Sequence, residues 1–300
     1  MNSNIRTDLA LEAREIWTEN SKNSGELRGV EAKTAEKGNI KVTTVEILDK
    51  QGEQALGKPM GKYVSVELEG FMRHEENSFD DACALLSTEL RDILNLEKDA
   101  SVLVAGLGNS GITPDSIGPE CVNNVMVTRH LKARMPGDFK SFRSVSAVCT
   151  GVLGTTGMES KALLEAVTTH IKPSVIIAVD ALASRRTERL CSTIQIADTG
   201  IVPGSGVGNA REALNKETLG VPVIAIGVPT VVDAGTLAVS VAEDAGITLD
   251  PSSLGAKAGM IVTTRDIDKQ VKNISRIIGY SINMALHDGL RIEDVSAFIS

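Results

Sequence analysis

Two aspartates in this chain follow apolar runs and could perform hydrolytic chemistry together. Asp115 lies in the loop GLGNSGITPDSIGP after the run SVLVA (101–105), and Asp180 follows the run SVIIAV (174–179). Both runs have the composition of buried parallel strands, and open α/β sheets bind ligands beyond the carboxyl ends of such strands. Acids that are distant in sequence but gathered at one sheet edge are typical of hydrolytic or metal chemistry.

Two close carboxylates allow two mechanisms, and the residues leave both open. Because the two cannot both ionise cheaply, one would hold a proton as the acid while the other activates water as the base. Alternatively, Asp115 and Asp180 could bind a divalent metal, with Asp233 as a third ligand, to polarise a carbonyl and generate hydroxide. Asp198 and Asp233 also follow strand-like runs, which favours a carboxylate cluster over separate helix caps.

Two glycine-rich loops are further candidates. GLGNSG (106–111) matches a dinucleotide-binding fingerprint, but no helix follows directly, so an active-site loop that presents Asn109 and Asp115 is the better interpretation. PGSGVGNAR (203–211) lacks the Lys-Ser/Thr of a Walker-type phosphate site. It is either a flexible surface turn or a loop whose backbone amides, around Gly204 and Gly206, cradle a substrate.

Other catalytic and metal-binding signatures are weak in this sequence. It contains no G-x-S-x-G elbow of a serine hydrolase and no H-E-x-x-H zinc motif, although His130 follows the Asp115 loop. The cysteines form no C-x-x-C pair, so we expect core thiols in a reducing cytosol rather than a zinc site or disulfides. They are Cys83, Cys121, Cys149 and Cys191.

The composition limits the classes of partner. With 300 residues, 42% of them hydrophobic and only 3% aromatic, the chain can build a large aliphatic core. A net charge of −8 without a basic cluster argues against a nucleic-acid partner. No run is long enough for a membrane span, and the N-terminus lacks the apolar core of a signal peptide. A non-catalytic peptide- or nucleotide-binding module remains an alternative from another class.

The first hundred residues predict a small antiparallel unit. Residues 41–48 and 62–68 alternate between apolar and polar side chains on either side of the turn-rich GEQALGKPMG, which predicts two antiparallel strands with one wet face. A short helix is expected over residues 8–20. Another is expected to begin at Ser78, with Ser78 and Asp81 capping free amides.

From residue 101 the pattern becomes strand, loop and helix in repetition. Strands this apolar are buried on both faces, as in a parallel sheet covered by helices. The predicted strands after the first are 144–151, 174–179, 192–198 and 221–228, and a last helix is expected over about 264–288. No interdomain linker stands out. The predicted fold class is therefore α/β, with a mostly parallel central sheet flanked by helices and a small antiparallel N-terminal extension.

Four segments give the chain a specific resemblance. They are RTDLALEA, GLGNSGITPDSIGP with VTRHL, VDALASRRTER, and IADTGIVPGSGVGN followed by GVPVIAIGVPTVVDA. Together they run almost end to end, and the chain resembles the germination proteases of endospore-forming bacteria. The resemblance implies an endopeptidase that needs no cofactor and digests small acid-soluble DNA-protecting spore proteins. It also implies a fold similar to that of hydrogenase-maturation proteases.

The resemblance also implies roles for particular residues. The family's proposed catalytic aspartates fall on Asp115 and Asp180, with acid and base unassigned, so the enzyme would be an atypical aspartic peptidase. Asn109, Thr113 and the two glycine loops would donate hydrogen bonds to the substrate or to an oxyanion. The tripeptide Asp198-Thr199-Gly200 matches the pepsin-type signature by coincidence, since only one copy is present.

Finally, the resemblance implies a self-processing precursor. Family cleavage sites carry an acid before the cut, then an apolar residue, alanine, any residue and glutamate. Residues Thr7 to Glu12 fit this pattern, which predicts a cut between Asp8 and Leu9, a propeptide of residues 1–8 and a single peptidase domain over 9–300. The simpler alternative makes Asp8 a helix cap. A homotetramer in the cytoplasm of the forespore or spore core is expected, although the C-terminal region is shortened: longer relatives carry an additional segment between VPTVVDAG and the last helix.

Overall fold

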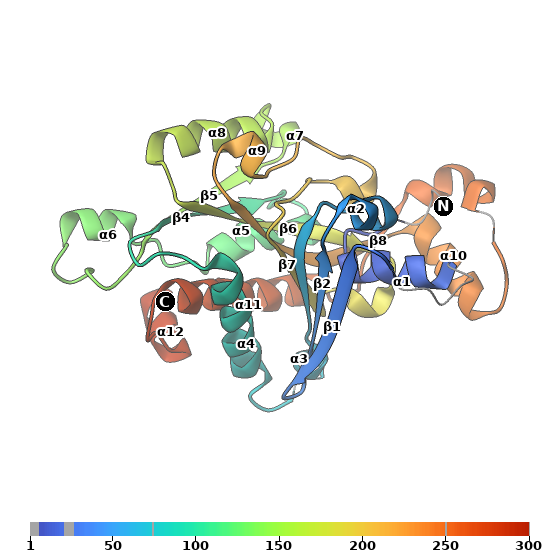
Figure 1. The fold of residues 1–300 in the computed structure, drawn as a ribbon, viewed down its shortest axis with the longest axis horizontal. Coiled ribbons are helices and arrows are strands. Elements are labelled where there is room, and N and C mark those ends of the chain that lie inside the picture. Colours follow the sequence, from blue (N-terminus) through green and yellow to red (C-terminus); the bar gives the residue numbers. More distant parts are fainter. Residues whose placement is uncertain (1–5, 21–26, 74, 250, 300) are drawn as a thin grey trace.

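A single mixed sheet runs through the centre of the structure, a computed structural model that describes residues 6–20, 27–73, 75–249 and 251–299. Its strand order is β1-β2-β3-β7-β8-β6-β4-β5, and the short β9 pairs with β8 (Figure 1). The strands are β1 Val30–Lys37, β2 Ile40–Ile47, β3 Gly61–Glu67, β4 Ser101–Leu107, β5 Ser144–Gly151, β6 Val175–Ser184, β7 Thr193–Ala197, β8 Val223–Asp233 and β9 Ile261–Val262.

The sheet has a parallel half and an antiparallel half. Strands β5, β4, β6 and β8 run parallel, whereas β1, β2, β3 and β7 pair antiparallel with their neighbours. This confirms the predicted α/β class, the parallel core and the antiparallel extension formed by residues 41–48 and 62–68. One difference matters for the site. Strand β7, predicted among the parallel strands, runs antiparallel to β8, so its carboxyl end lies at the opposite edge of the sheet.

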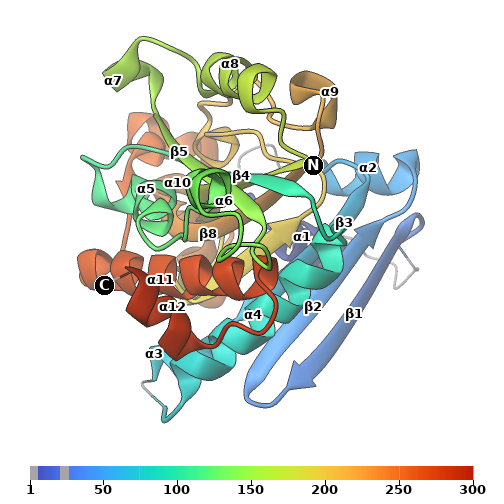
Figure 2. The same cartoon turned by 90° about the vertical axis from the view of Figure 1, so that its left-hand side faces the viewer.

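Helices cover both faces of the sheet (Figures 1 and 2). The α-helices are α1 Ala10–Asn20, α2 Lys50–Leu56, α3 Glu69–Met72, α4 Ser78–Leu94, α5 Ile117–Val122, α6 Arg129–Arg134, α7 Leu153–Thr156, α8 Ser160–Ile171, α9 Lys216–Leu219, α10 Ala234–Asp244, α11 Ile267–Leu286 and α12 Ile292–Ile299. Short 3₁₀ turns are η1 Thr113–Asp115, η2 Thr187–Arg189, η3 Ser205–Val207 and η4 Pro251–Gly259.

Alternation along β6 decides which residue faces which helices. Ile177 and Val179 pack into the cluster formed with α4, α5 and α11, while Ile176 and Ala178 pack on the opposite face with α8 and α9. Because side chains alternate along a strand, Asp180 must share the face of Ile176 and Ala178. That face also carries α1 and α2 over the antiparallel half of the sheet.

Several local expectations differ from the structure. Helix α4 begins at Ser78 as expected, but neither Ser78 nor Asp81 caps it. The N-cap residue is Asn77, which makes no side-chain capping hydrogen bond, and the Ser78 hydroxyl donates to the Glu75 carbonyl. The turn-rich segment after β2 contains the helix α2, whose amides are capped by Asp49. Strand β1 and helix α12 were not predicted. No helix in the described part of the chain is long and apolar enough to cross a membrane.

Glycines let α5 pack directly on the sheet. Gly118, on α5, lies so close to β4 and β6 that a Cβ there would overlap backbone atoms of Leu107 and Val179. Gly106 faces it from β4 and meets the Gly118 carbonyl in the same way. This contact fixes the loop between β4 and α5, which carries Asp115, against the end of β6.

We predict that Gly118→Ala lowers the free energy of unfolding by about 1–3 kcal/mol or more, because the added methyl group must displace backbone rather than a flexible side chain. Urea denaturation followed by circular dichroism measures the loss. The control is Gly137→Ala, where a Cβ meets no atom within 4 Å. We expect it to change stability by less than about 0.5 kcal/mol. Equal effects of the two substitutions would contradict the packing argument.

Candidate active site

Asp180 lies inside β6 rather than after it. The strand continues to Ser184, but its pairing with β4 ends at Val179, opposite Gly106. Asp180 is therefore the first residue of β6 without a β4 neighbour, while β8 still flanks it through Gly227. Its carboxyl is almost fully buried, with 5% of the residue exposed, and one oxygen accepts the N–H of Ala181 at 2.9 Å.

The loop after β4 brings Asp115 to the same place. The backbone N–H of Asn109 donates to both the carbonyl and the carboxylate of Asp115, at 2.9 Å each. Gly108 makes this turn possible, because its φ is +102° and a Cβ would overlap the Asp115 carbonyl. The Thr230 hydroxyl donates to the Pro114 carbonyl at 2.7 Å and ties the loop to β8.

A cavity of about 500 Å³ joins the two aspartates. Asp115 and Asp180 line it, and so does Asp8 from the N-terminal segment. Its lining also includes the exposed apolar side chains Ile112, Leu153 and Ile261. The cavity thus combines buried acids with an apolar wall, which suits a peptide substrate better than a small charged ligand.

Burial shifts the proton affinity of both carboxyls. It raises the pKa of Asp115, against the opposing hydrogen bond from the Asn109 N–H. Deeper burial raises the pKa of Asp180 well above its usual range, and the negative charges of Asp115 and Asp8 raise it further. Asp180 is therefore the member of the pair that holds a proton, and Asp115 is the one that ionises first.

The other predicted site residues have different positions. Asn109, Gly204 and Gly206 line the cavity, whereas Thr113 lies in η1 outside its lining. Asp233 caps α10 by accepting the N–H groups of Gly235 and Thr236. The expected third metal ligand is thus engaged elsewhere. In the described ranges no group of three or more His, Cys, Asp or Glu side chains is placed to hold a metal ion.

The expectation that Asp198 joins the carboxylate cluster is wrong. Because β7 is antiparallel to β8, Asp198 emerges at the far edge of the sheet, where it accepts the N–H of Lys62 at 2.8 Å.

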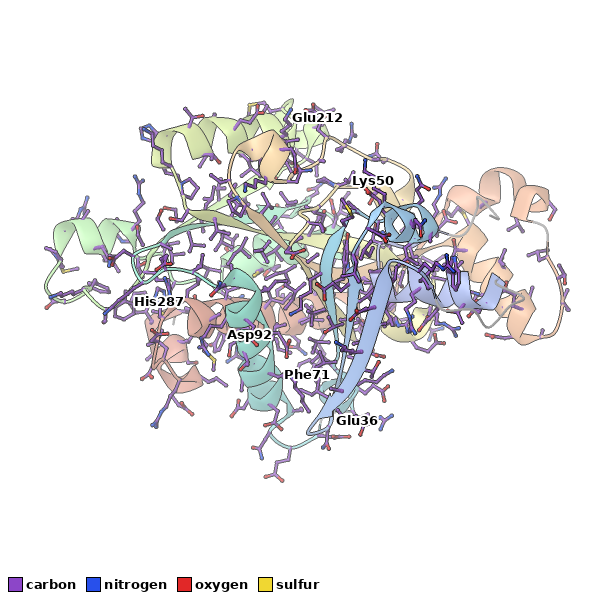
Figure 3. The ribbon with its side chains drawn as sticks, viewed as in Figure 1. Glu36, Lys50, Phe71, Asp92, Glu212 and His287 are labelled. Carbon is purple, nitrogen blue, oxygen red and sulfur yellow. The ribbon has the colours of Figure 1, made fainter. Side chains whose placement is uncertain are left out.

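His287, labelled in Figure 3, has a structural role. Its Nδ1 accepts the Arg143 N–H, and burial, with the charges of Arg143 and Lys132, lowers its pKa to about 4. Buried Cys83 and Cys191 have pKa values raised by burial to about 12.

The N-terminal segment reaches the same cavity. The Asp8 N–H donates to the Ala183 carbonyl at 2.9 Å, so the segment continues along the end of β6. The Gln195 side chain brackets the Asp8–Leu9 peptide: its Nε2 donates to the Asp8 carbonyl at 3.3 Å, and its Oε1 accepts the Ala10 N–H at 2.7 Å.

The sheet register explains this position of Gln195. Gln195 and Asp180 both lie opposite Gly227, on either side of β8, so the two side chains share one row and one face of the sheet. Leu182 packs over Gly227 between them. Sequence alone gave no sign of this, because the row exists only when β7 pairs with β8 in the antiparallel sense.

The sequence comparisons with known proteins agree on one family. A family model described as germination protease matches residues 10–245. The germination protease of Clostridium tetani is 42% identical over 323 residues, which covers 99% of each protein. That of Bacillus velezensis is 46% identical over 239 residues, which covers 78% of this chain and 65% of the relative. A NiFe hydrogenase maturation protease from Thermococcus kodakarensis has 14% identity and a TM-score of 0.36, covering 65% of this chain and 98% of that chain.

The burial of Asp180 predicts a stability gain in Asp180→Asn. Below the ordinary aspartate pKa of about 3.9, both the folded and the unfolded state hold the proton, so the burial of Asp180 lowers the free energy of unfolding little there. As the pH rises through the ordinary aspartate pKa, only the unfolded state ionises freely, and the folded state loses stability relative to it. The variant escapes this loss, so its thermal midpoint at pH 7 should exceed the wild-type value by about 3 °C or more.

Thermal melts between pH 4 and pH 8 measure this effect, and the advantage should shrink toward pH 4. The control is Asp138→Asn, in an exposed loop, which should follow the wild-type curve at every pH. A wild type more stable than Asp180→Asn at pH 7 would mean that Asp180 is ionised and stabilised in the folded state.

Proposed function

Because the chain belongs to the germination protease family and is thus a peptidase, we propose that Asp115 and Asp180 are its catalytic pair. The observation that carries the proposal is their meeting in one cavity beside the Asp8–Leu9 peptide. Two acids with raised pKa values and unequal burial are the arrangement that general acid–base hydrolysis requires.

In the proposed reaction Asp115 is the base and Asp180 the acid. Asp115 takes a proton from a water molecule as the water oxygen bonds to the carbonyl carbon. Asp180 gives its proton to the peptide nitrogen as the carbon–nitrogen bond breaks. Gln195 polarises the carbonyl through its Nε2, a role that the contact with Asp8 supports and that replaces the predicted role of Thr113.

We further propose that the chain cuts itself between Asp8 and Leu9. Two observations support this: Asp8 lines the cavity with both aspartates, and the carbonyl of the bond in question already accepts a hydrogen bond from Gln195. Leu9 and Ala10, on the far side of the bond, are fully buried, so the segment is held in place rather than loosely draped over the surface.

The remaining parts of the proposal rest on family membership. We propose that the substrates in trans are the small acid-soluble proteins of the spore, that the enzyme is made as a zymogen, and that it acts as a homotetramer in the spore core. The apolar cavity wall fits the apolar residues expected beside the cut.

We predict that Asp115→Asn and Asp180→Asn each reduce cleavage by about 10²–10⁴-fold, because each removes one proton-transfer group. The measurement is mass spectrometry of the purified chain, and of a peptide with the sequence of residues 6–16, over time. The control is Asp198→Asn, at the far sheet edge, which should cleave at the wild-type rate. Full activity in either cavity variant would remove that residue from the mechanism.

The same assay separates the two carboxylate mechanisms. An aspartic peptidase keeps its rate after exhaustive chelation, whereas a metal-dependent peptidase loses activity and regains it on addition of a divalent ion. A chain that binds the peptide without cleaving it under any condition would instead favour a non-catalytic binding module.

We also predict a bell-shaped pH dependence of self-cleavage. The alkaline limb marks deprotonation of Asp180 and should lie well above the ordinary pKa of an aspartate, since burial and Asp115 raise the pKa of Asp180. The acidic limb marks protonation of Asp115. Rates measured from pH 4 to pH 9 test this, and a rate that only increases up to pH 9 would exclude Asp180 as the acid.

A further inference from the structure

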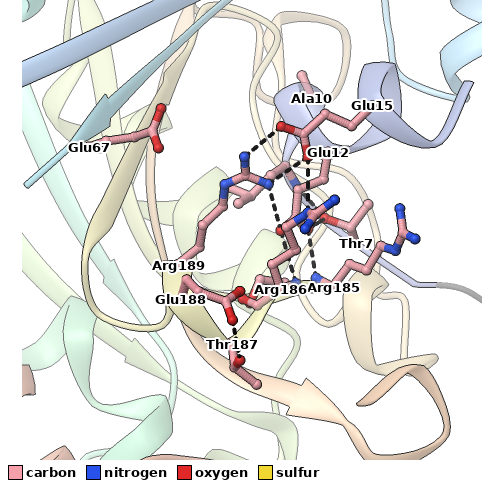
Figure 4. A network of polar contacts seen from close by, with 12 residues as sticks. Thr7, Ala10, Glu12, Glu15, Glu67, Arg185, Arg186, Thr187, Glu188 and Arg189 are labelled. Carbon is pink, nitrogen blue, oxygen red and sulfur yellow. Dashed lines mark hydrogen bonds and ion pairs between the residues drawn. The ribbon is translucent and has the colours of Figure 1, made fainter. Parts of the chain in front are cut away.

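The Glu12 carboxylate is bound as completely as a ligand would be. Glu12 is fully buried, and one oxygen accepts the Arg185 N–H at 2.6 Å and the Thr7 hydroxyl at 2.5 Å. The other accepts the Arg186 N–H and an Arg189 guanidinium N–H, both at 3.1 Å (Figure 4). Three of the four donors belong to the segment that follows β6.

The Asp8 carboxylate, four residues earlier, is bound by two donors from other parts of the chain. One oxygen accepts the Ser205 hydroxyl at 2.6 Å and the other the Ala183 N–H at 2.9 Å. Gly206 lies so close that a Cβ there would overlap this carboxylate. Ser205 and Gly206 belong to the second glycine loop, which therefore forms a pocket shaped around an acidic side chain.

The backbone between the two carboxylates is held as well. Gln195 bonds on either side of Leu9, and the Lys58 ammonium donates to the Thr7 carbonyl at 3.1 Å. Beyond Leu9 the chain enters the first turn of α1, which brings Glu12 back toward Thr7 and over the end of β6. Residues 7–12 thus occupy a continuous site made by other parts of the chain.

We propose that this site reads substrates through two carboxylate pockets. Ser205 and the Ala183 N–H recognise an acidic residue directly before the cleaved bond, and Arg189 with the N–H groups of Arg185 and Arg186 recognises a glutamate four positions later. The chain's own Asp8 and Glu12 fill the pockets in this structure. The proposal rests on the proposed peptidase function, to which it adds the residues that determine specificity.

A purely structural anchor would be built differently. Burying a carboxylate and an arginine costs desolvation, and apolar residues of similar size usually hold a helix as well or better. Other contacts already tie α1 down, including Glu19 to Arg185 and Glu15 to Arg189. A pocket that supplies hydrogen-bond donors to both oxygens of one carboxylate instead discriminates a carboxylate from a neutral amide, because an amide would leave some of the donors without an acceptor.

Occupation by the chain itself has a consequence for cleavage in trans. A cut after Asp8 leaves Glu12 attached to the enzyme, so the second pocket remains filled by α1. A free peptide must therefore displace the first turn of α1 from the pocket beside Arg189, and it must present its own glutamate on a similar helical turn.

The test compares three peptides on the full-length protein. The parent has the sequence of residues 6–16, and the other two carry Asp8→Asn or Glu12→Gln within the peptide. We expect each amide to lower kcat/KM by about 10- to 100-fold for the wild-type enzyme, because a charge-assisted hydrogen-bond set is lost. Ser205→Ala in the enzyme should reduce only the Asp-over-Asn preference, and Arg189→Met only the Glu-over-Gln preference.

The matched control is Arg186→Met in the enzyme. This substitution removes one positive charge from the same segment, together with the ion pairs that Arg186 makes to Glu15 and Glu19 of α1. It keeps the Arg186 backbone N–H, which donates to Glu12. We expect it to retain the wild-type Glu-over-Gln ratio. If Arg189→Met retains that ratio too, Arg189 only anchors α1 and the second pocket is refuted. An unchanged Asp-over-Asn ratio in Ser205→Ala refutes the first.

Failure of the proposed function looks different. In that case the wild type cleaves neither itself nor any peptide, and specificity ratios do not exist. The pockets are then judged by fluorescence anisotropy of the labelled parent peptide. Binding that weakens about tenfold in Arg189→Met but not in Arg186→Met supports the pocket without catalysis, and equal binding to all three proteins overturns it.

Discussion

The candidate active site of this protein depends on burying the Asp180 carboxyl next to a second acid. A carboxyl in this position favours its neutral form, because desolvation and the charge of Asp115 both oppose ionisation and raise its pKa. The sheet creates the position by ending the β4 pairing at Gly106 while β8 continues beside β6. The glycine contacts that press α5 on the sheet then bring the loop with Asp115 over the gap. Because the pairing of β6 with β4 ends before its pairing with β8, Asp180 is buried beside Asp115, and the pKa values of the two carboxyls differ as acid–base chemistry would require.

The fold stabilises the acids in and beside the cavity in different ways. Asp180 keeps its proton. Asp8 is met by neutral donors, a hydroxyl and a backbone N–H, at a partly exposed position. Glu12, fully buried, is met by the guanidinium of Arg189 and by backbone N–H groups. The way each carboxyl is stabilised depends on how deeply it is buried and on whether a positively charged side chain is nearby, because a buried carboxylate needs either a proton or a full set of hydrogen-bond donors. Asp180 lacks such a set of donors, which fits the role of proton donor that we propose for it.

The sequence predicted the parallel half of this fold well, because strands buried on both faces are continuous apolar runs and their helices are amphipathic. It also predicted that Asp115 and Asp180 lie close together, because both come at or after apolar runs that form the neighbouring parallel strands β4 and β6. The sequence did not predict the features that depend on the direction of a strand or on which strands pair. Nothing in STIQIAD shows that β7 runs antiparallel, and that direction alone removes Asp198 from the site and adds Gln195. Strand β1, charged and exposed along most of its length, has too little apolar alternation to be recognised.

The docking of α1 has the energetics of a contact that can open. Its innermost pair, Glu12 with Arg189, lies in a site of low dielectric and is specific but offers little net stability, since desolvation offsets most of the attraction. An outer pair joins Glu19 of α1 to Arg185; Glu19 is nearly half exposed, so water screens the pair and it contributes little. Apolar burial at Leu9 and Ala10 contributes further affinity, and it is available equally to any peptide with apolar residues at those places. The segment is therefore held by interactions that a substrate can reproduce residue by residue. Replacement of this segment by a substrate peptide then costs little free energy beyond the entropy lost when a free peptide binds.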